Sequence, residues 1–259
     1  MSASIHETAI IAEGARIGEG CFIGPFCTIG AGVTLEDRVR LESHVVVDGD
    51  TKIGADTKVF PFVSIGLGPQ DLKYAGEPTS VVIGERNVIR EFVTIHRGTT
   101  GGGGVTRLGN ENLLMAQSHV AHDCQLGDGI IMANGATLAG HVEIADRANI
   151  GAYSGVHQFC RIGLEAFVGG YSVVVKDAPP FATIQGNHAR CFGLNRVGMR
   201  RRGYSPETIQ NLHHAYHLLL SAKLNTSQAL ERIKSEISGC REVGLLVDFI
   251  ETTKRGVVL

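Results

Sequence analysis

The sequence contains no tryptophan, and aromatic residues make up only 6% of its 259 residues. No apolar run approaches the ~20 residues that a membrane-spanning helix needs. Neither sign of charge dominates, since 24 Lys and Arg face 26 Asp and Glu, and a general nucleic-acid binder would need a basic face. Residues 1–11 carry Glu7 and lack the basic-then-apolar pattern of a signal peptide. We therefore expect a cytoplasmic protein that has no membrane span and binds no nucleic acid.

The six cysteines are scattered without the CxxC spacing of a metal or redox site. In a cytosolic chain of this size they are expected to be reduced and mostly buried. Glycine, in contrast, is abundant at 34 residues. A glycine-rich, aromatic-poor composition indicates many tight corners that join short strands.

An apolar residue recurs at every sixth position through most of the chain. The phase runs from Ile5 to Ile65, returns at Ile83, Ile89 and Ile95, and continues without a gap from Leu108 to Val174. With 43% hydrophobic residues, chance would fill the twelve slots of the last run about four times in 100,000. Neither the helical period of 3.6 nor the strand period of 2 selects every sixth position.

Glycine often follows the apolar residue, so each hexad can form one short strand and one corner. Stacked coils would bury a continuous core, which predicts a parallel β-helix over residues 1–190. Two interruptions, near residues 66–82 and 96–107, are predicted to leave the body as loops. We expect the first loop to carry binding residues, whereas neutral decoration is the simpler interpretation of the second, which holds Gly101 to Gly104.

The pattern changes in the last part of the chain, and residues 191–259 are predicted to form a small α-helical domain. Ser205 suits an N-cap and Pro206 the first position of a helix. Further helices are expected from about Thr226 and over about residues 243–252. This domain is expected to cap the open end of the β-helix.

Four histidines of the central coils lie outside the inward apolar slots. With 18 residues per coil, His122 and His141 are one coil plus one residue apart, and His119 and His157 are two coils plus two residues apart. We expect these side chains to gather in one functional patch. A neutral imidazole can take a proton from a hydroxyl at physiological pH.

Two residues beside this patch suit the same chemistry. Asp123 is placed to fix an imidazole tautomer, although neighbours in a strand usually point opposite ways. Gly140 can bring a backbone N–H close to a developing oxyanion. The sequence has no GxSxG elbow and no cysteine with basic neighbours. Direct transfer with histidine as the base is therefore favoured over a covalent intermediate.

An ordered set of motifs in this chain resembles the UDP-N-acetylglucosamine O-acyltransferase family, over nearly its whole length. Together with the hexads, the motifs are residues 70–79 (QDLKYAGEPT), 94–99 (TIHRGT), 119–124 (HVAHDC), 138–142 (LAGHV), 156–160 (VHQFC), 185–188 (QGNH) and 201–203 (RRG). The resemblance implies a left-handed β-helix and a homotrimer with active sites between subunits. It also implies transfer of an R-3-hydroxyacyl group from acyl carrier protein to the 3-hydroxyl of UDP-N-acetylglucosamine, the first step of lipid A biosynthesis. No metal and no cofactor is implied, because the phosphopantetheine of acyl carrier protein belongs to a substrate.

The resemblance also implies roles for individual residues. His122 matches the general base and Gly140 the oxyanion-stabilising amide. Residues that match the lining of the sugar and acyl site are Asp71, Lys73, His119, His141, His157 and Gln158. Those that match the nucleotide-contacting region are His188, Asn195, Arg201 and Arg202. Gly170 falls where the family sets the depth of its acyl channel, and Val197 stands where many relatives carry an acidic residue.

Four alternatives remain open at this point. An amino-substituted UDP-sugar acceptor would give an amide in place of an ester. The related N-acyltransferase that acts two steps later usually has an extra N-terminal domain, whereas the hexads here begin at Ile5. A γ-class carbonic anhydrase shares the trimeric fold and would bind zinc through residues such as His119, His122 and His141. The last alternative is a catalytically silent scaffold.

Overall fold

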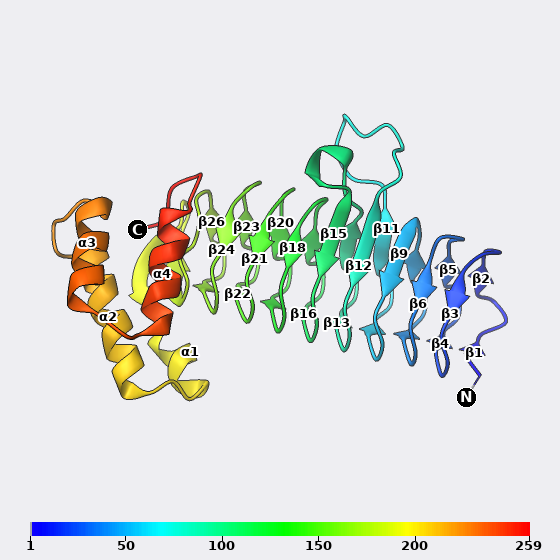
Figure 1. Ribbon diagram of the computed structural model, residues 1–259. Coiled ribbons are helices and arrows are strands. Elements are labelled where there is room, and N and C mark those ends of the chain that lie inside the picture. Colours follow the sequence, from blue (N-terminus) through cyan, green and yellow to red (C-terminus); the bar gives the residue numbers. More distant parts are fainter. Residues whose placement is uncertain (1) are drawn as a thin grey trace.

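The computed structural model, which describes residues 2–259, shows a rod of stacked triangular coils with a bundle of helices at one end (Figure 1). The coils form a left-handed parallel β-helix, as predicted. Strands one coil apart pair in parallel, and in uninterrupted coils their partners are 18 residues apart, as Ile5 and Ile23 are. The hexapeptide pattern therefore gives three hexads per coil, one on each face.

The three faces are three parallel sheets. The first contains β1 (Ser4–Ile5), β4 (Phe22–Ile23), β7 (Arg40–Leu41), β10 (Lys58–Val59), β13 (Val88–Ile89), β16 (Leu113–Leu114), β19 (Ile131–Met132), β22 (Asn149–Ile150), β25 (Phe167–Val168), β27 (Ala182–Gln185) and the antiparallel β28 (Arg190–Leu194). The second contains β2 (Ile10–Ile11), β5 (Thr28–Ile29), β8 (Val46–Val47), β11 (Ser64–Leu67), β14 (Thr94–His96), β17 (His119–Val120), β20 (Thr137–Leu138), β23 (Gly155–Val156) and β26 (Val173–Val174). The third contains β3 (Arg16–Ile17), β6 (Thr34–Leu35), β9 (Asp50–Ile53), β12 (Ser80–Ile83), β15 (Val105–Leu108), β18 (Gln125–Leu126), β21 (Glu143–Ile144) and β24 (Arg161–Ile162).

The residues of the six-residue phase form the core of the rod. From Ile23 to Val174 every one of them is buried. Burying each such aliphatic side chain contributes roughly 1.5–3 kcal/mol. Ile5 has the same phase but is 47% exposed, because it lies in the terminal coil and no coil stacks on its outer side. Four of the six cysteines are buried and all six are free thiols, in agreement with the sequence.

Each corner of the triangle places a residue in the left-handed backbone region, even where that residue is not glycine. The corner between the first and second sheets stacks aromatic rings, among them Phe62 and Phe92 with centroids 5.1 Å apart. The corner between the third and first sheets pairs charges between coils, as in Arg38 with Asp56 at 2.7 Å. The corner between the second and third sheets carries the histidines, and both inserts leave the rod there.

The two inserts are joined at their bases. The first spans residues 68–79 between β11 and β12, and the second spans 97–104, including the 3-10 helix η1 (Thr100–Gly102). The Ser80 N–H donates to the Gly104 carbonyl at 2.8 Å, and the Gly98 N–H donates to the Ser80 carbonyl at 3.3 Å. The first loop is held by Arg97, whose Nε donates to the hydroxyl of Tyr74 at 2.9 Å. Figure 1 shows both inserts on one side of the rod.

The change from strands to helices falls after β28, where four helices follow: α1 (Arg196–Arg201), α2 (Pro206–Leu220), α3 (Thr226–Glu236) and α4 (Arg241–Glu251). The predicted start of α2 is confirmed, since the Ser205 hydroxyl accepts from the Thr208 N–H. The predicted start of α3 is also confirmed, with a capping box between Asn225 and Gln228. The sequence did not predict α1, because six residues with Gly198 among them show no apolar periodicity.

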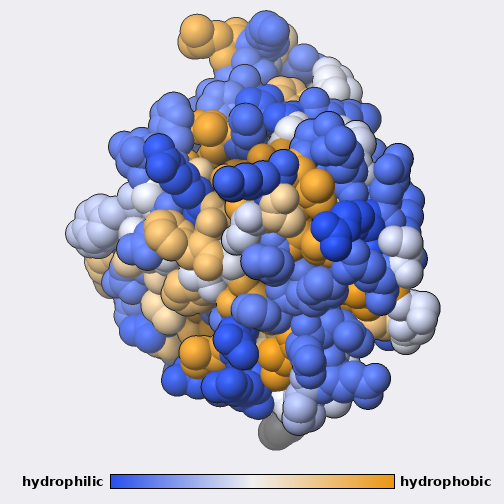
Figure 2. All heavy atoms as spheres, turned by 90° about the vertical axis from the view of Figure 1, so that its left-hand side faces the viewer, coloured by the Kyte–Doolittle hydropathy of each residue, from blue (hydrophilic) through white to orange (hydrophobic). Residues whose placement is uncertain are grey.

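The helices close one end of the rod. The Tyr216 hydroxyl of α2 is buried and donates to the Pro180 carbonyl at 2.5 Å. The Arg161 guanidinium donates to Asp177 at 3.0 Å and to the Phe249 carbonyl of α4 at 2.9 Å. Seen from this end, the helical face is mostly hydrophilic with small apolar patches (Figure 2). Among residues 2–259, none of the helices combines the length and apolar character needed to cross a bilayer.

Candidate active site

His122 and Asp123 form a hydrogen-bonded pair at the corner after β17. The His122 Nδ1 lies 2.7 Å from Asp123 Oδ2, with the two side chains 16% and 0% exposed. These residues lie in the turn, outside the strand, and Asp123 has a left-handed φ of 61°. The strand rule that sends neighbours to opposite sides therefore does not apply here. Because the carboxylate can only accept, it holds the proton on Nδ1 and leaves Nε2 free to accept one.

Gly140 occupies the next coil of the same corner, directly against the imidazole. A Cβ built on it would lie 2.5 Å from His122 Cε1 and 2.7 Å from Nε2. Within residues 2–259 the Gly140 N–H has no acceptor. The absence of a side chain therefore lets a free backbone donor approach the reactive nitrogen of His122.

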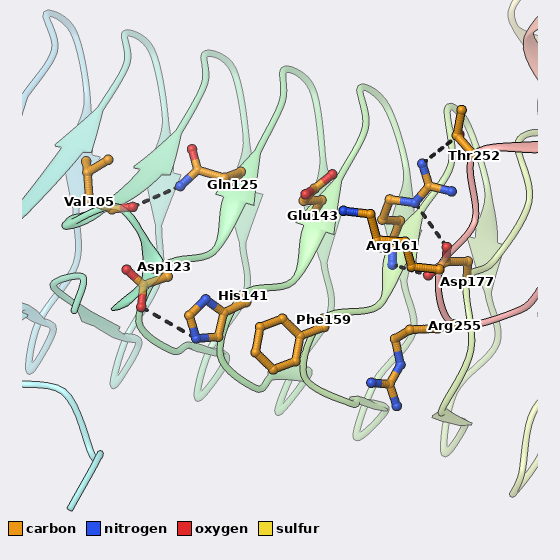
Figure 3. A pocket seen from close by; sticks show the side chains of 12 residues that line it. Val105, Asp123, Gln125, His141, Glu143, Phe159, Arg161, Asp177, Thr252 and Arg255 are labelled. Atoms are coloured by element: carbon orange, nitrogen blue, oxygen red, sulfur yellow. Dashed lines mark hydrogen bonds and ion pairs between the residues drawn. The ribbon is translucent and has the colours of Figure 1, made fainter. Parts of the chain in front are cut away.

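His141 forms the wall of a groove of about 610 Å³ beside the pair (Figure 3). Its ring meets that of His122 edge-on at 5.1 Å and stacks on Phe159 at 4.3 Å. Burial is the main cause of its lowered pKa, and the nearby carboxylate of Asp123 opposes this shift. His141 is therefore neutral at neutral pH and is available for hydrogen bonding to a ligand.

His119 lies one strand deeper and contacts a residue that the sequence did not single out for the site. Its Nδ1 is 2.6 Å from the Thr94 hydroxyl, and its ring meets His96 edge-on at 5.0 Å. His96 is 7% exposed and its Nδ1 has no partner among the described residues. The 25-residue spacing between paired residues in these coils, in place of 18, hid the alignment of His96 with the site.

The pKa of His119 gives a prediction about stability. Burial, assisted by His96 and His122, lowers this pKa from 6.5 to about 4. The unfolded chain therefore binds a proton near pH 6.5 that the folded chain binds only near pH 4, so the free energy of unfolding falls as the pH drops through this window. In His119→Asn, the loss of Tm between pH 7 and pH 5 should be smaller than in the wild type. The exposed His213→Asn is the control, and equal losses in the wild type and His119→Asn would refute the assignment.

His157 and Gln158 lie further along the same corner and are exposed. The His157 Nδ1 is 3.3 Å from the Arg255 guanidinium, in the segment after α4. Of the four histidines predicted to gather, His122 and His141 are in ring contact. His119 adjoins His96, and His157 marks the far end of the row. The patch is thus a row along one corner.

Asp71 and Lys73 lie in the first insert. The Asp71 carboxylate accepts from the Lys73 N–H at 3.0 Å, and its charge acts to raise the pKa of His141. The loop therefore reaches the electrostatic surroundings of the histidine row. Leu72, between them, is fully exposed.

The residues that match the nucleotide region are divided between two grooves. Asn195, Arg201 and Arg202 line one of about 510 Å³ together with Val197, whereas His188 lines another of about 640 Å³ beside the C-terminus. Arg202 pairs with the buried Glu165 at 3.2 Å. Arg201 has no ion pair among the described residues and is the freer cation. Gly170 is exposed at the aromatic corner, next to Tyr171.

One group of side chains has metal-binding potential: ligand atoms of His122, Asp123 and His141 lie within 4.8 Å of one another. Asp123, however, already accepts three hydrogen bonds, from the Thr99 N–H, the Thr99 hydroxyl and His122. The three-histidine set is not assembled either, because Nδ1 of His119 is engaged with Thr94. These donors fit a carboxylate–imidazole pair better than the zinc centre of a carbonic anhydrase.

A hexapeptide β-helix with an imidazole base and a free backbone donor at one corner is the arrangement of a hexapeptide-repeat transferase. Residues 14–49 match the bacterial transferase hexapeptide family, and residues 177–258 match the second domain of UDP-N-acetylglucosamine O-acyltransferase. The chain belongs to the acyl-[acyl-carrier-protein]–UDP-N-acetylglucosamine O-acyltransferase family, as the following relatives show.

The relative from Alkalilimnicola ehrlichii is 49% identical over 197 residues, which cover 76% of both chains. The relative from Herminiimonas arsenicoxydans is 47% identical over 204 residues, covering 77% of this chain and 78% of its own. Both carry the family name. The solved UDP-N-acetylglucosamine O-acyltransferase of Moraxella catarrhalis matches with a TM-score of 0.95 at 44% identity and covers 100% of both chains. The corresponding Bacteroides fragilis structure has a TM-score of 0.96 at 40% identity and covers 98% of this chain and 100% of that one.

Proposed function

We propose that this protein transfers an R-3-hydroxyacyl group from acyl carrier protein to the glucosamine 3-hydroxyl of UDP-N-acetylglucosamine, the first step of lipid A biosynthesis. The observation that carries the proposal is the His122–Asp123 pair with the Gly140 N–H against it. Family membership supplies the donor and the acceptor. The site supplies a base and an oxyanion donor at the same corner.

In the proposed mechanism, His122 Nε2 removes the proton of the 3-hydroxyl while Asp123 stabilises the imidazolium through Nδ1. The sugar oxygen attacks the thioester carbonyl and forms the new C–O bond. The Gly140 N–H stabilises the negative charge on the carbonyl oxygen. The C–S bond then breaks, and the thiolate of phosphopantetheine takes the proton from His122. This reaction needs no metal or organic cofactor.

The proposal includes a homotrimer whose active sites lie between subunits. The fully exposed Leu72 on the projecting first insert supports contact with a second copy, since a large apolar side chain in water is typical of an interface. Asp71 and Lys73 would then serve two subunits. A cytoplasmic location is also part of the proposal, and six free thiols in one chain favour a reducing compartment.

The experiment that tests this function compares two acceptors with a panel of R-3-hydroxyacyl carrier proteins. We expect acylated UDP-N-acetylglucosamine at a kcat/KM at least about tenfold above that of the 3-amino-substituted sugar, since a base set for a hydroxyl has no need to deprotonate an amine. The preferred chain length would test the role of Gly170. Faster acylation of the amino sugar would overturn the ester assignment and establish the amide alternative.

A further inference from the structure

The second insert, expected above to be neutral decoration, lies against the carboxylate of Asp123. The Thr99 N–H donates to Asp123 Oδ1 at 2.8 Å, and the Thr99 hydroxyl donates to Oδ2 at 2.6 Å. Oδ2 is the same oxygen that His122 Nδ1 approaches at 2.7 Å. Both carboxylate oxygens are therefore fixed by one residue of the insert.

The geometry of the insert is specific to this contact. Thr99 is the N-cap residue of η1, yet its hydroxyl makes no capping hydrogen bond, although capping is the usual role of threonine there. The hydroxyl is instead turned to Asp123. The turn is closed by the Gly102 and Gly104 N–H groups, which donate to the Thr99 carbonyl at 3.0 and 2.9 Å.

Two glycines complete the contact because they have no side chain. A Cβ on Gly102 would lie 2.0 Å from Asp123 Cγ, and one on Gly98 would lie 2.8 Å from Oδ1. On the other side, the Asp123 N–H donates to the buried Thr106 hydroxyl at 2.8 Å. The Asp123 side chain is accordingly 0% exposed. An ionised carboxylate without water requires such donors.

We propose that Thr99 and Gly102 are positioning residues of the reaction, which hold the Asp123 carboxylate dry and aimed at His122 Nδ1. This inference rests on the proposed function. Neither residue touches the reacting atoms, so their effect passes through Asp123. Their loss should lower kcat and leave the KM for the sugar nearly unchanged, because the groove itself is intact.

The first test is a double-mutant cycle on acyl transfer. Thr99→Val should lower kcat about tenfold or more, and Thr99→Ser should restore it. In the Asp123→Ala background, Thr99→Val should change kcat by less than about twofold, since the group it positions is gone. Thr100→Val, an exposed neighbour in η1, is the control and should match the wild type. An equal loss in both backgrounds would show a merely structural role and overturn the inference.

The second test uses a matched pair of glycines. Gly102→Ala should lower kcat about tenfold, whereas Gly101→Ala, whose Cβ would meet nothing within 4 Å, should not. The downfield proton NMR signal of His122 Nδ1–H gives a readout that does not depend on the acceptor. Its loss in Thr99→Val and Gly102→Ala supports the inference even if the sugar assay fails with the wild type. An unchanged signal in both variants would overturn it.

Discussion

His122→Ala should lower kcat by at least about 1,000-fold, because a positioned general base contributes roughly 10²–10⁴ and Asp123 then has no imidazole to orient. His122 lies at a corner and outside the inward slots, so the β-helix should fold as before. Single-turnover measurement of acyl transfer, together with the Tm of the variant, checks this.

His122→Gln serves as the companion variant, since it retains polarity but cannot accept a proton at neutral pH. Both variants should bind UDP-N-acetylglucosamine with a Kd near that of the wild type, so that the loss lies in kcat. A kcat within about tenfold of the wild type in either variant would contradict the assignment of the base.

Gly140→Ala should lower kcat about 100-fold with little change in Tm. Its Cβ would lie 2.5 Å from His122 Cε1, a distance at which either the ring or the backbone must shift. The shift removes the alignment of the imidazole with its substrate and moves the N–H that faces the oxyanion, a donor worth about 10²–10³ in comparable sites. Initial-rate kinetics with saturating substrates measure the effect.

Gly155→Ala is the matched control for this variant. Gly155 lies in β23, in the coil next to that of Gly140, and a Cβ on it would meet nothing within 4 Å. It should keep the kcat of the wild type within about twofold. If Gly140→Ala were as active as Gly155→Ala, Gly140 would have no role in the reaction.

The fold was largely predictable because a single physical requirement repeats along the chain. Each coil must bury its own apolar residue, so the period survives in the sequence wherever coils stack regularly. The hexads from Leu108 to Val174 show this, and all are buried. The helix starts at Ser205 and Thr226 were predictable for a comparable reason, since caps depend on residues close in sequence.

The candidate site was only partly predictable, because its contacts connect different coils and inserts. The spacing of His122 and His141 indicated their proximity, but the pairing of His122 with Asp123 depends on a left-handed corner residue, which no strand rule anticipates. The contact of Thr99 with Asp123 spans 24 residues across an insert. Insert length breaks the 18-residue register, so neither His96 nor Thr99 could be placed by counting.

The central claim is direct acyl transfer to the sugar hydroxyl with His122 as base, and intact-mass spectrometry of a quenched reaction tests it most directly. Purified protein is mixed with R-3-hydroxyacyl carrier protein, first alone and then with UDP-N-acetylglucosamine. The account predicts unmodified protein in both samples, and in the second sample one acyl ester per nucleotide sugar with an equal amount of free carrier thiol. An acylated form of the protein, or no acylated sugar with any chain length, would contradict it.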